Sequence, residues 1–416
     1  MARSCGIVAL MSEKLSRPAL VIAAVICMCV VVSHMFGRST ISILLPAIRN
    51  DLVDSNTAAG VLGGSNFAGY IFGVIIVTLL AGRTEPIHMM RAGLAISAAA
   101  LVLLAVAPSF LTLSVGVWLI GLGGAGIWVT APALATANVP ASRRGAVLGA
   151  LTATMGIGLL GLSQGTTLYR RVVDNEDAWR PIFGIEAAIA VVILAAAFLL
   201  VRPRPTDRQV ERGAIVSASA LRSIPQWKLL LACYTMFSAL AGAWTQFLGL
   251  ALKADAGFSS THVNNLFSVF AVAGIVGPLA LGQLSDRIGR DRTLAIAGAV
   301  CVAASLLLTL NAEPWSSIAV GLYGGGSFSI PILTAAAVRD HLDDRSFGSA
   351  YGTITILYGF GSFAAALIAG VIADWRGSFD LVYVLLAMLS GLSSVMALIR
   401  FRMLASEGAS HQPLNS

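Results

Sequence analysis

Arg38 is the residue whose type and position most directly suggest chemistry. It stands roughly 20 residues into an apolar stretch that continues through Ile41 to Pro46, at a depth where a charge costs at least about 2.5–3.5 kcal/mol. A guanidinium offers a planar fork of N–H donors that fits both oxygens of a carboxylate. The sequence therefore indicates a binding group for a small organic anion. The competing interpretation is an arginine that extends to the outer membrane interface.

Two further residues are candidates for proton coupling. His34 lies one helical turn before Arg38, on the same face of a continuous helix, and histidine titrates near neutral pH. Glu186 is the acid that we place inside a span, where it could neutralise Arg38 or carry a proton. The alternatives are a hydrogen-bonded packing histidine and a carboxyl group near the outer surface, because Arg180 is close in the sequence.

Other polar and aromatic side chains within apolar stretches could line a substrate cavity, which needs a few such groups among apolar walls. Asn66 and Tyr70 share one face of the second span, and Gln246, Tyr323 and Tyr358 belong to later spans. For each of these five residues, packing between helices is the alternative to contact with substrate.

These residues must be positioned by helices in a lipid bilayer. Apolar residues make up 57% of the 416 residues, charged residues make up 11%, and the mean hydropathy is +0.84, values far from those of soluble domains. A spanning helix needs about 20 mostly apolar residues, and we expect twelve of them. The expected spans are residues 18–48, 57–81, 92–107, 109–137, 145–168, 181–201, 227–252, 260–284, 293–310, 315–338, 348–373 and 380–399.

The net charge of +7 is a sign of topology. Most Lys and Arg residues fall in loops on the side of both termini, as on the cytoplasmic side of membrane proteins. We therefore predict cytoplasmic termini and no nucleic-acid partner. Four of the five cysteines lie in spans and no metal-ligand spacing occurs, so we expect neither a disulfide framework nor a cofactor.

A polar stretch divides the chain into two halves. We expect a cytoplasmic tail at 1–17, a six-helix bundle at 18–201, a cytoplasmic linker at 202–226, a second six-helix bundle at 227–400 and a cytoplasmic tail at 401–416. Halves of this kind are related by an axis along the membrane normal and hold the substrate site between them. The predicted fold class is an all-α membrane protein with 12 transmembrane helices in two pseudo-symmetric six-helix bundles.

A short charged loop between expected spans 8 and 9 carries the most specific motif. It reads Gly282-Gln283-Leu284-Ser285-Asp286-Arg287-Ile288-Gly289-Arg290-Asp291-Arg292. The pattern Gly-x-x-x-Asp-Arg-x-Gly-Arg-x-Arg closely resembles the signature loop of the major facilitator superfamily of secondary transporters. The resemblance implies transport by rocking of the two halves and no enzymatic activity. The corresponding loop of the first half, residues 81–91, lacks the Asp-Arg-x-Gly core.

The resemblance also implies a gate at this loop. Asp286 would face the positive N-terminal end of span 5, near Arg144, and hold the inner side shut. The arginines of the loop would pair with Asp286 or with Asp340. The alternative is that these arginines only anchor the loop on the cytoplasmic side. The expected gating residues are Gly282, Asp286, Arg287, Gly289, Arg290, Arg144 and Asp340.

The first span resembles the organic-anion symporter branch of the superfamily, in which an Asp-Arg pair precedes a Leu-Pro at the spacing of Arg38 and Leu45-Pro46. Gly37 occupies the Asp position, so the anion-binding arginine remains while the case for proton coupling through that acid weakens. The resemblance implies a transporter for a small organic anion coupled to protons. We expect it to be a monomer in the bilayer of a bacterial inner membrane.

Two other function classes stay open. One is a proton-driven exporter of drugs or other amphipathic compounds, although span 5 has no Gly-Pro-x-x-Gly-Gly run and span 4 has Trp118 where such exporters usually carry arginine. The other is a membrane sensor without transport, although no soluble stretch is long enough for an output domain. Transport assays separate these classes, because a sensor moves nothing.

Overall fold

The structure is a computed structural model that describes residues 17–80, 83–137, 139, 141–202 and 218–410. Every regular element in these ranges is helical. Twelve helical segments among them are long and apolar enough to cross a membrane. The predicted all-α membrane fold with 12 spanning helices is therefore confirmed.

Two of the twelve spans consist of more than one helix. Span 1 is formed by α2 and α3, and span 7 by α10, a π-helical segment η1 and α11. The elements of the first half are α2 (Arg17–His34), α3 (Arg38–Leu52), α4 (Asn56–Leu80), α5 (Pro86–Ala105), α6 (Phe110–Thr136), α7 (Ala141–Val173) and α8 (Arg180–Leu200). The elements of the second half are α9 (Ala218–Arg222), α10 (Trp227–Ala239), η1 (Leu240–Trp244), α11 (Thr245–Ala254), α12 (Ser260–Ile288), α13 (Arg290–Leu308), α14 (Trp315–Arg339), α15 (Asp344–Arg376) and α16 (Asp380–Ser410).

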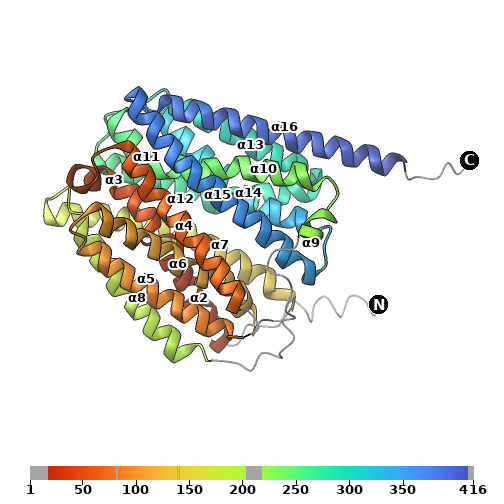
Figure 1. The fold of residues 1–416 in the computed structure, drawn as a ribbon, viewed down its shortest axis with the longest axis horizontal. Coiled ribbons are helices and arrows are strands. Elements are labelled where there is room, and N and C mark those ends of the chain that lie inside the picture. The colour runs from red at the N-terminus through yellow and green to blue at the C-terminus, as the bar shows by residue number, and fades with distance from the viewer. Residues whose placement is uncertain (1–16, 81–82, 138, 140, 203–217, 411–416) are drawn as a thin grey trace, which may run out of the picture.

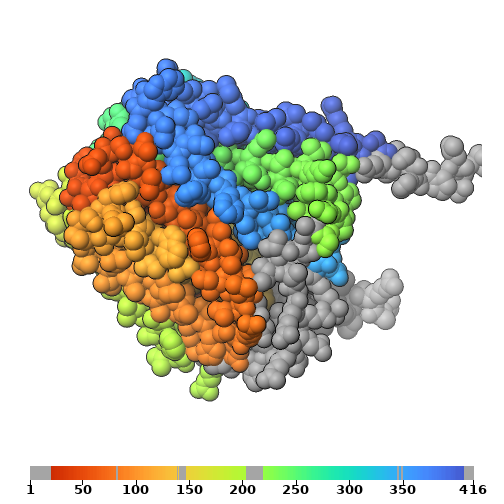
Figure 2. All heavy atoms as spheres, in the orientation of Figure 1, coloured from red at the N-terminus to blue at the C-terminus, as the bar shows by residue number. Residues whose placement is uncertain are grey.

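The two halves of the chain lie beside each other and meet along a seam. In Figure 1 the helices of the first half, red to yellow-green, lie below those of the second half, green to blue. Three pairs of helices form the seam: α4 with α15, α7 with α12, and α3 with α11. Figure 2 shows the orange surface of α4 directly against the blue surface of α15. α2 begins and α16 ends toward one end of the molecule, which we call the terminal face; the opposite end, where α3 meets α11, is the far face (Figure 1).

The helix of span 1 is interrupted inside the membrane. α2 ends at His34 and α3 begins at Arg38, with Gly37 between them at φ +71. Glycine adopts this backbone conformation without a steric penalty, and a Cβ at this position would lie 2.7 Å from Cγ1 of Ile120. The expected continuous helix is therefore wrong here, because Gly37 allows the chain to turn and restart.

We expect Gly37→Ala to lower the melting temperature of the purified protein. Alanine in this left-handed conformation costs about 1–2 kcal/mol, and its methyl group would contact Ile120. Gly184→Ala is the matched control, because Gly184 lies within α8 with nothing within 4 Å of an added Cβ. The control should keep or raise the melting temperature. Equal melting temperatures for the two variants would contradict a strained break at Gly37.

The last helix extends further than the second bundle was expected to reach. α16 continues to Ser410, whereas the sequence suggested a tail from residue 401. Residues 401–405 include good helix formers such as Arg402, Met403 and Leu404, so the helix has no local reason to end there.

Candidate functional site

Arg38 opens α3 and is half buried beside the seam. Its guanidinium carbon lies 4.6 Å from the centre of the Phe67 ring on α4. Tyr70 of α4 and Tyr358 of α15 lie within electrostatic reach of the same guanidinium, so the group is placed next to both halves. Among the described residues, no carboxylate lies within 4.0 Å of Arg38. The charge is therefore available to an acidic ligand.

The carboxylate of Glu186, on α8, binds the N-terminal end of α3, where span 1 resumes as a helix. Its Oε2 accepts a hydrogen bond of 3.2 Å from the backbone N–H of Gly37, and its Oε1 accepts a short one from the hydroxyl of Thr40. The side chain is buried, with 3% exposed. A carboxylate in this position acts as an N-cap for α3 that is supplied by another helix. Glu186 is therefore buried between helices, and among the described residues it forms no ion pair with Arg38.

His34 packs within the first half. Its ring nitrogen Nδ1 shares a hydrogen bond of 2.7 Å with the hydroxyl of Ser33, and its ring centre lies 4.4 Å from that of Trp128 on α6. The prediction that His34 and Arg38 share a helix face is wrong, because the α-helix stops between them. The two residues still lie within electrostatic reach of each other.

Four tyrosines gather around the Arg38 position, and sequence reasoning identified only two of them. Tyr234 of α10 stacks on Tyr358 with ring centres 5.0 Å apart and shares a side-chain hydrogen bond with Tyr351. Tyr351 and Tyr358 are two helical turns apart on α15 and therefore share a face. That spacing was the signal in the sequence that could have revealed Tyr351. The surroundings of Arg38 therefore contain more aromatic side chains than the sequence analysis expected.

The other three expected cavity residues make packing contacts. Asn66 donates a hydrogen bond of 3.3 Å to the carbonyl oxygen of Val117 on α6. Tyr323 is 1% exposed and stacks on Trp244 with ring centres 3.6 Å apart, inside the second half. Gln246 is buried against Gly63 across the seam, and its Nε2 has no hydrogen-bond partner. Gln246 therefore keeps a buried polar atom free for a ligand.

The charged loop between α12 and α13 makes its ion pairs within its own half. Nη1 of Arg290 lies 2.6 Å from Oδ1 of Asp286, and Nε of Arg290 lies 3.1 Å from Oδ2 of Asp340. Gly289 has φ +94, which allows the tight turn between the helices. Asp286 is 68% exposed and pairs with Arg290. The side chain of Arg144 lies outside the described residues.

The other arginines of the loop do not form the expected pairs. Arg292 lies with its guanidinium carbon 4.0 Å from the ring centre of Phe401 on α16, and Arg287 is exposed. Gly282 has no atom within 4 Å of an added Cβ, so close packing does not require glycine there. Among the described residues, the ion pairs of the loop are centred on Arg290 at the terminal face.

The far face, in contrast, is joined across the seam. Asp374 of α15 accepts hydrogen bonds of 2.8 Å from the backbone N–H groups of Asn56 and Thr57 and one of 2.6 Å from the Thr57 hydroxyl. These groups are the first residues of α4, so an acid of the second half caps a helix of the first half. Close backbone approach accompanies the cap: a Cβ at Gly370 would lie 2.3 Å from the carbonyl oxygen of Asn56.

A second set of hydrogen bonds joins α7 to α12 on the same side of the molecule. Asn264 Nδ2 donates to Thr167 Oγ1 at 2.8 Å, and the Ser163 and Ser268 hydroxyl groups share a bond of 2.8 Å. Gln164 also donates to Ser268 at 2.7 Å. Together with the Asp374 cap, these bonds close the far face around the seam.

Comparisons with known proteins agree with this architecture. The family model described as Major Facilitator Superfamily matches residues 27–336 and 235–414. The chain is 24% identical over 367 residues to the protein AraJ of Escherichia coli (strain K12), covering 86% of this chain and 90% of AraJ. It is 26% identical over 302 residues to the chloramphenicol resistance protein of Streptomyces lividans, covering 71% and 74%. A crystal structure of a mutant form of the nucleoside transporter NupG matches with a TM-score of 0.75 and 12% identity, over 92% of this chain and 99% of that one, which shows a common fold.

Proposed function

The chain belongs to the major facilitator superfamily, and we propose that this membrane transporter moves a small organic anion together with protons by alternating access. The twelve apolar spans and the family match establish an integral membrane protein that transports and is not an enzyme. The anion, the protons and the mechanism are what we propose here.

The single observation that carries the substrate class is the unpaired guanidinium of Arg38. A charge within a span is retained against a cost of about 2.5–3.5 kcal/mol or more, and such charges commonly mark a substrate or ion path. The neighbouring phenol groups of Tyr70 and Tyr358 offer further hydrogen-bond donors from α4 and α15. A carboxylate bound by Arg38 would therefore contact both halves, as rocking around a central site requires.

Glu186 supports coupling to protons through the position of α3. The ionised carboxylate accepts from Gly37 N–H and Thr40 Oγ1 at the positive end of that helix, an arrangement worth up to about 2 kcal/mol when buried. Protonation removes the charge and one acceptor. Because α3 begins at Arg38, loading Glu186 with a proton would release the helix end that carries the anion-binding group.

We expect Glu186→Gln to uncouple transport from the pH gradient. The amide cannot carry the charge, so uptake into proteoliposomes should no longer respond to an imposed gradient, while exchange of labelled for unlabelled substrate at equal pH continues. Glu313→Gln, at an exposed loop acid, should behave like the unmodified protein. A full gradient response in Glu186→Gln would remove Glu186 from the coupling path.

The direction of the molecule follows from its charge pattern. If the basic loops place the terminal face in the cytoplasm, the far face lies outside and this conformation is closed to the outside. The loop at Asp286 would then bind α7 only in the alternative state. One chain contains both halves and the whole Arg38 site, which supports a monomer, and we place it in a bacterial inner membrane.

An exporter of amphipathic compounds is the second candidate. Two observations favour it: a relative named for chloramphenicol resistance, and stacked aromatic rings such as Tyr234 on Tyr358 beside the seam. Aromatic faces bind apolar and cationic compounds as well as acids. Arg38 argues against cationic compounds, because it would repel them.

Flux measurements in proteoliposomes test these functions together. Labelled mono- and dicarboxylates, tetraphenylphosphonium and chloramphenicol are offered with and without a pH gradient. We expect saturable carboxylate flux that follows the gradient. Flux of tetraphenylphosphonium or chloramphenicol without carboxylate flux would establish the exporter instead, and no flux of any compound would count against both transport proposals.

A further inference from the structure

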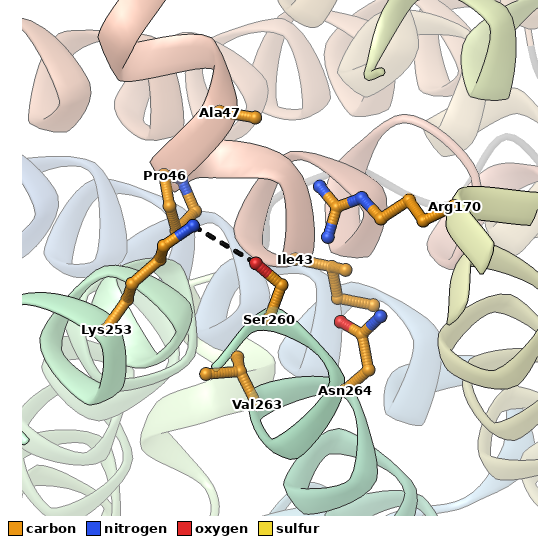
Figure 3. A pocket seen from close by; sticks show the side chains of 8 residues that line it. All are labelled: Ile43, Pro46, Ala47, Arg170, Lys253, Ser260, Val263 and Asn264. Atoms are coloured by element: carbon orange, nitrogen blue, oxygen red, sulfur yellow. Dashed lines mark hydrogen bonds between the residues drawn. The ribbon is translucent and has the colours of Figure 1, made fainter. Parts of the chain in front are cut away.

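A small enclosed space lies in the seam at the far face, away from Arg38. Figure 3 shows it between the α3 residues around Pro46, Arg170 of α7, Lys253 of α11 and Ser260 and Asn264 of α12. Its volume is about 10 Å³, close to the room that one water molecule needs. The first half contributes α3 and α7 and the second half contributes α11 and α12, so the space exists only while the far face is closed.

Arg170 points into this space without a direct counter-charge. The side chain is 8% exposed, and its Nε has no hydrogen-bond partner. Figure 3 shows the guanidinium directed toward the centre of the space. Among the described residues, no carboxylate lies within 4.0 Å of it. A buried donor group in this situation is costly unless something accepts from it.

Lys253 brings a second positive charge to the same place from the other half. Its Nζ donates to Ser260 Oγ at 3.1 Å, and that hydroxyl donates in turn to Glu176 at 3.0 Å. Glu176 and Asp177 follow α7 in an exposed loop and act on Arg170 electrostatically. Neither acid lines the space, so closure of the far face brings two cations to its wall.

We propose that this space binds a single halide-sized anion, chloride under ordinary conditions, held between Arg170 and Lys253. A water molecule could fill the volume, but it would bring no negative charge into contact with Arg170 or Lys253. A carboxylate substrate is too large for a space of about 10 Å³. The amide of Asn264, which is 1% exposed, borders the space and donates through Nδ2 to Thr167. This anion site is separate from the Arg38 site and goes beyond the proposed function.

The two cations belong to different halves, so the anion binds the closed far face and not the open one. A ligand that binds one of two conformations stabilises that conformation by mass action. Chloride would therefore favour the conformation seen here without being transported.

The test is the melting temperature of the full-length purified protein as chloride replaces gluconate at constant ionic strength. We expect a saturable rise in the unmodified protein and in Arg171→Gln, the control at the neighbouring exposed arginine. In Arg170→Gln and in Lys253→Gln, the chloride concentration at the midpoint of the rise should be at least tenfold higher. Bromide should replace chloride, and sulfate should not.

The site would be overturned if the melting temperature of the unmodified protein did not respond to chloride. It would also be overturned if Arg170→Gln kept the full response. Should Arg170→Gln fail to fold, an undiminished response in Lys253→Gln decides equally against it. Arg38→Ala separates the two anion sites, because it should keep the chloride response whether or not the Arg38 proposal holds.

Discussion

The Arg38→Ala variant is expected to show no rise in melting temperature with carboxylates that stabilise the unmodified protein. Arg38 has no carboxylate partner among the described residues, so its two parallel N–H donors are available to a ligand. Hydrogen bonds to charged groups contribute about 1.5–3 kcal/mol each, and losing two corresponds to a roughly 100-fold or greater loss of affinity. Carboxylate titrations followed by melting temperature measure this loss.

The stability of the ligand-free variant distinguishes binding from packing. An unpaired charge in a span destabilises the protein, so Arg38→Ala should melt at the same temperature as the unmodified protein or higher. A structural arginine would give the opposite result. The substitution also removes the contact with Phe67, and a cation–π contact at a partly exposed site contributes only about 0.5–1 kcal/mol.

Two further variants complete the comparison. Arg38→Lys keeps the positive charge but loses the pair of parallel N–H donors. We expect its affinity for carboxylates to fall by about tenfold, less than in Arg38→Ala. Arg171→Ala, at an exposed position on α7, should change nothing. Carboxylate binding by Arg38→Ala at unmodified affinity would refute the anion site.

The number of spans could be predicted because long apolar segments and the charged loop at residues 282–292 are local signals. A span needs about 20 apolar residues, and that requirement is visible residue by residue. The interruption at Gly37 could not be predicted in the same way. The backbone N–H of Gly37, at positive φ, donates to Glu186, which lies 149 residues away on another helix. A glycine beside an arginine gives no sign of such a partner.

The contacts across the seam were hidden from the sequence for the same reason. Asp374 stands at the end of a span, where an acid looks like an ordinary loop residue. Its partners are backbone N–H groups 317 and 318 residues away, and backbone groups leave no trace in side-chain types. The Asp286 loop has a recognisable pattern, and its role as a gate stays a prediction. The Asp374 cap has no such pattern, so it could be found only in the structure.

The Asp374→Ala variant is expected to open the far face more often. Asp374 accepts three hydrogen bonds from the first turn of α4, and it is the second half that supplies this cap to the first. Removing an N-cap side chain costs about 0.5–2 kcal/mol. The carboxylate is largely exposed, so solvent weakens its hydrogen bonds. We therefore expect the closed state to lose about 1 kcal/mol of stability, which raises the ratio of open to closed molecules roughly fivefold.

Labelling of an introduced cysteine measures that shift. Ala47→Cys places a thiol at the closed seam, where Ala47 is 3% exposed, and a membrane-impermeant maleimide reaches it only when the far face opens. We expect Asp374→Ala to speed labelling about fivefold, because the loss of about 1 kcal/mol from the cap increases the open population by that factor. Asp54→Asn is the matched control, because Asp54 is an exposed acid just before α4 whose loss should leave the rate unchanged. Equal rates for both variants would mean that the cap does not hold the far face shut, and closure would then depend on the hydrogen bonds between α7 and α12.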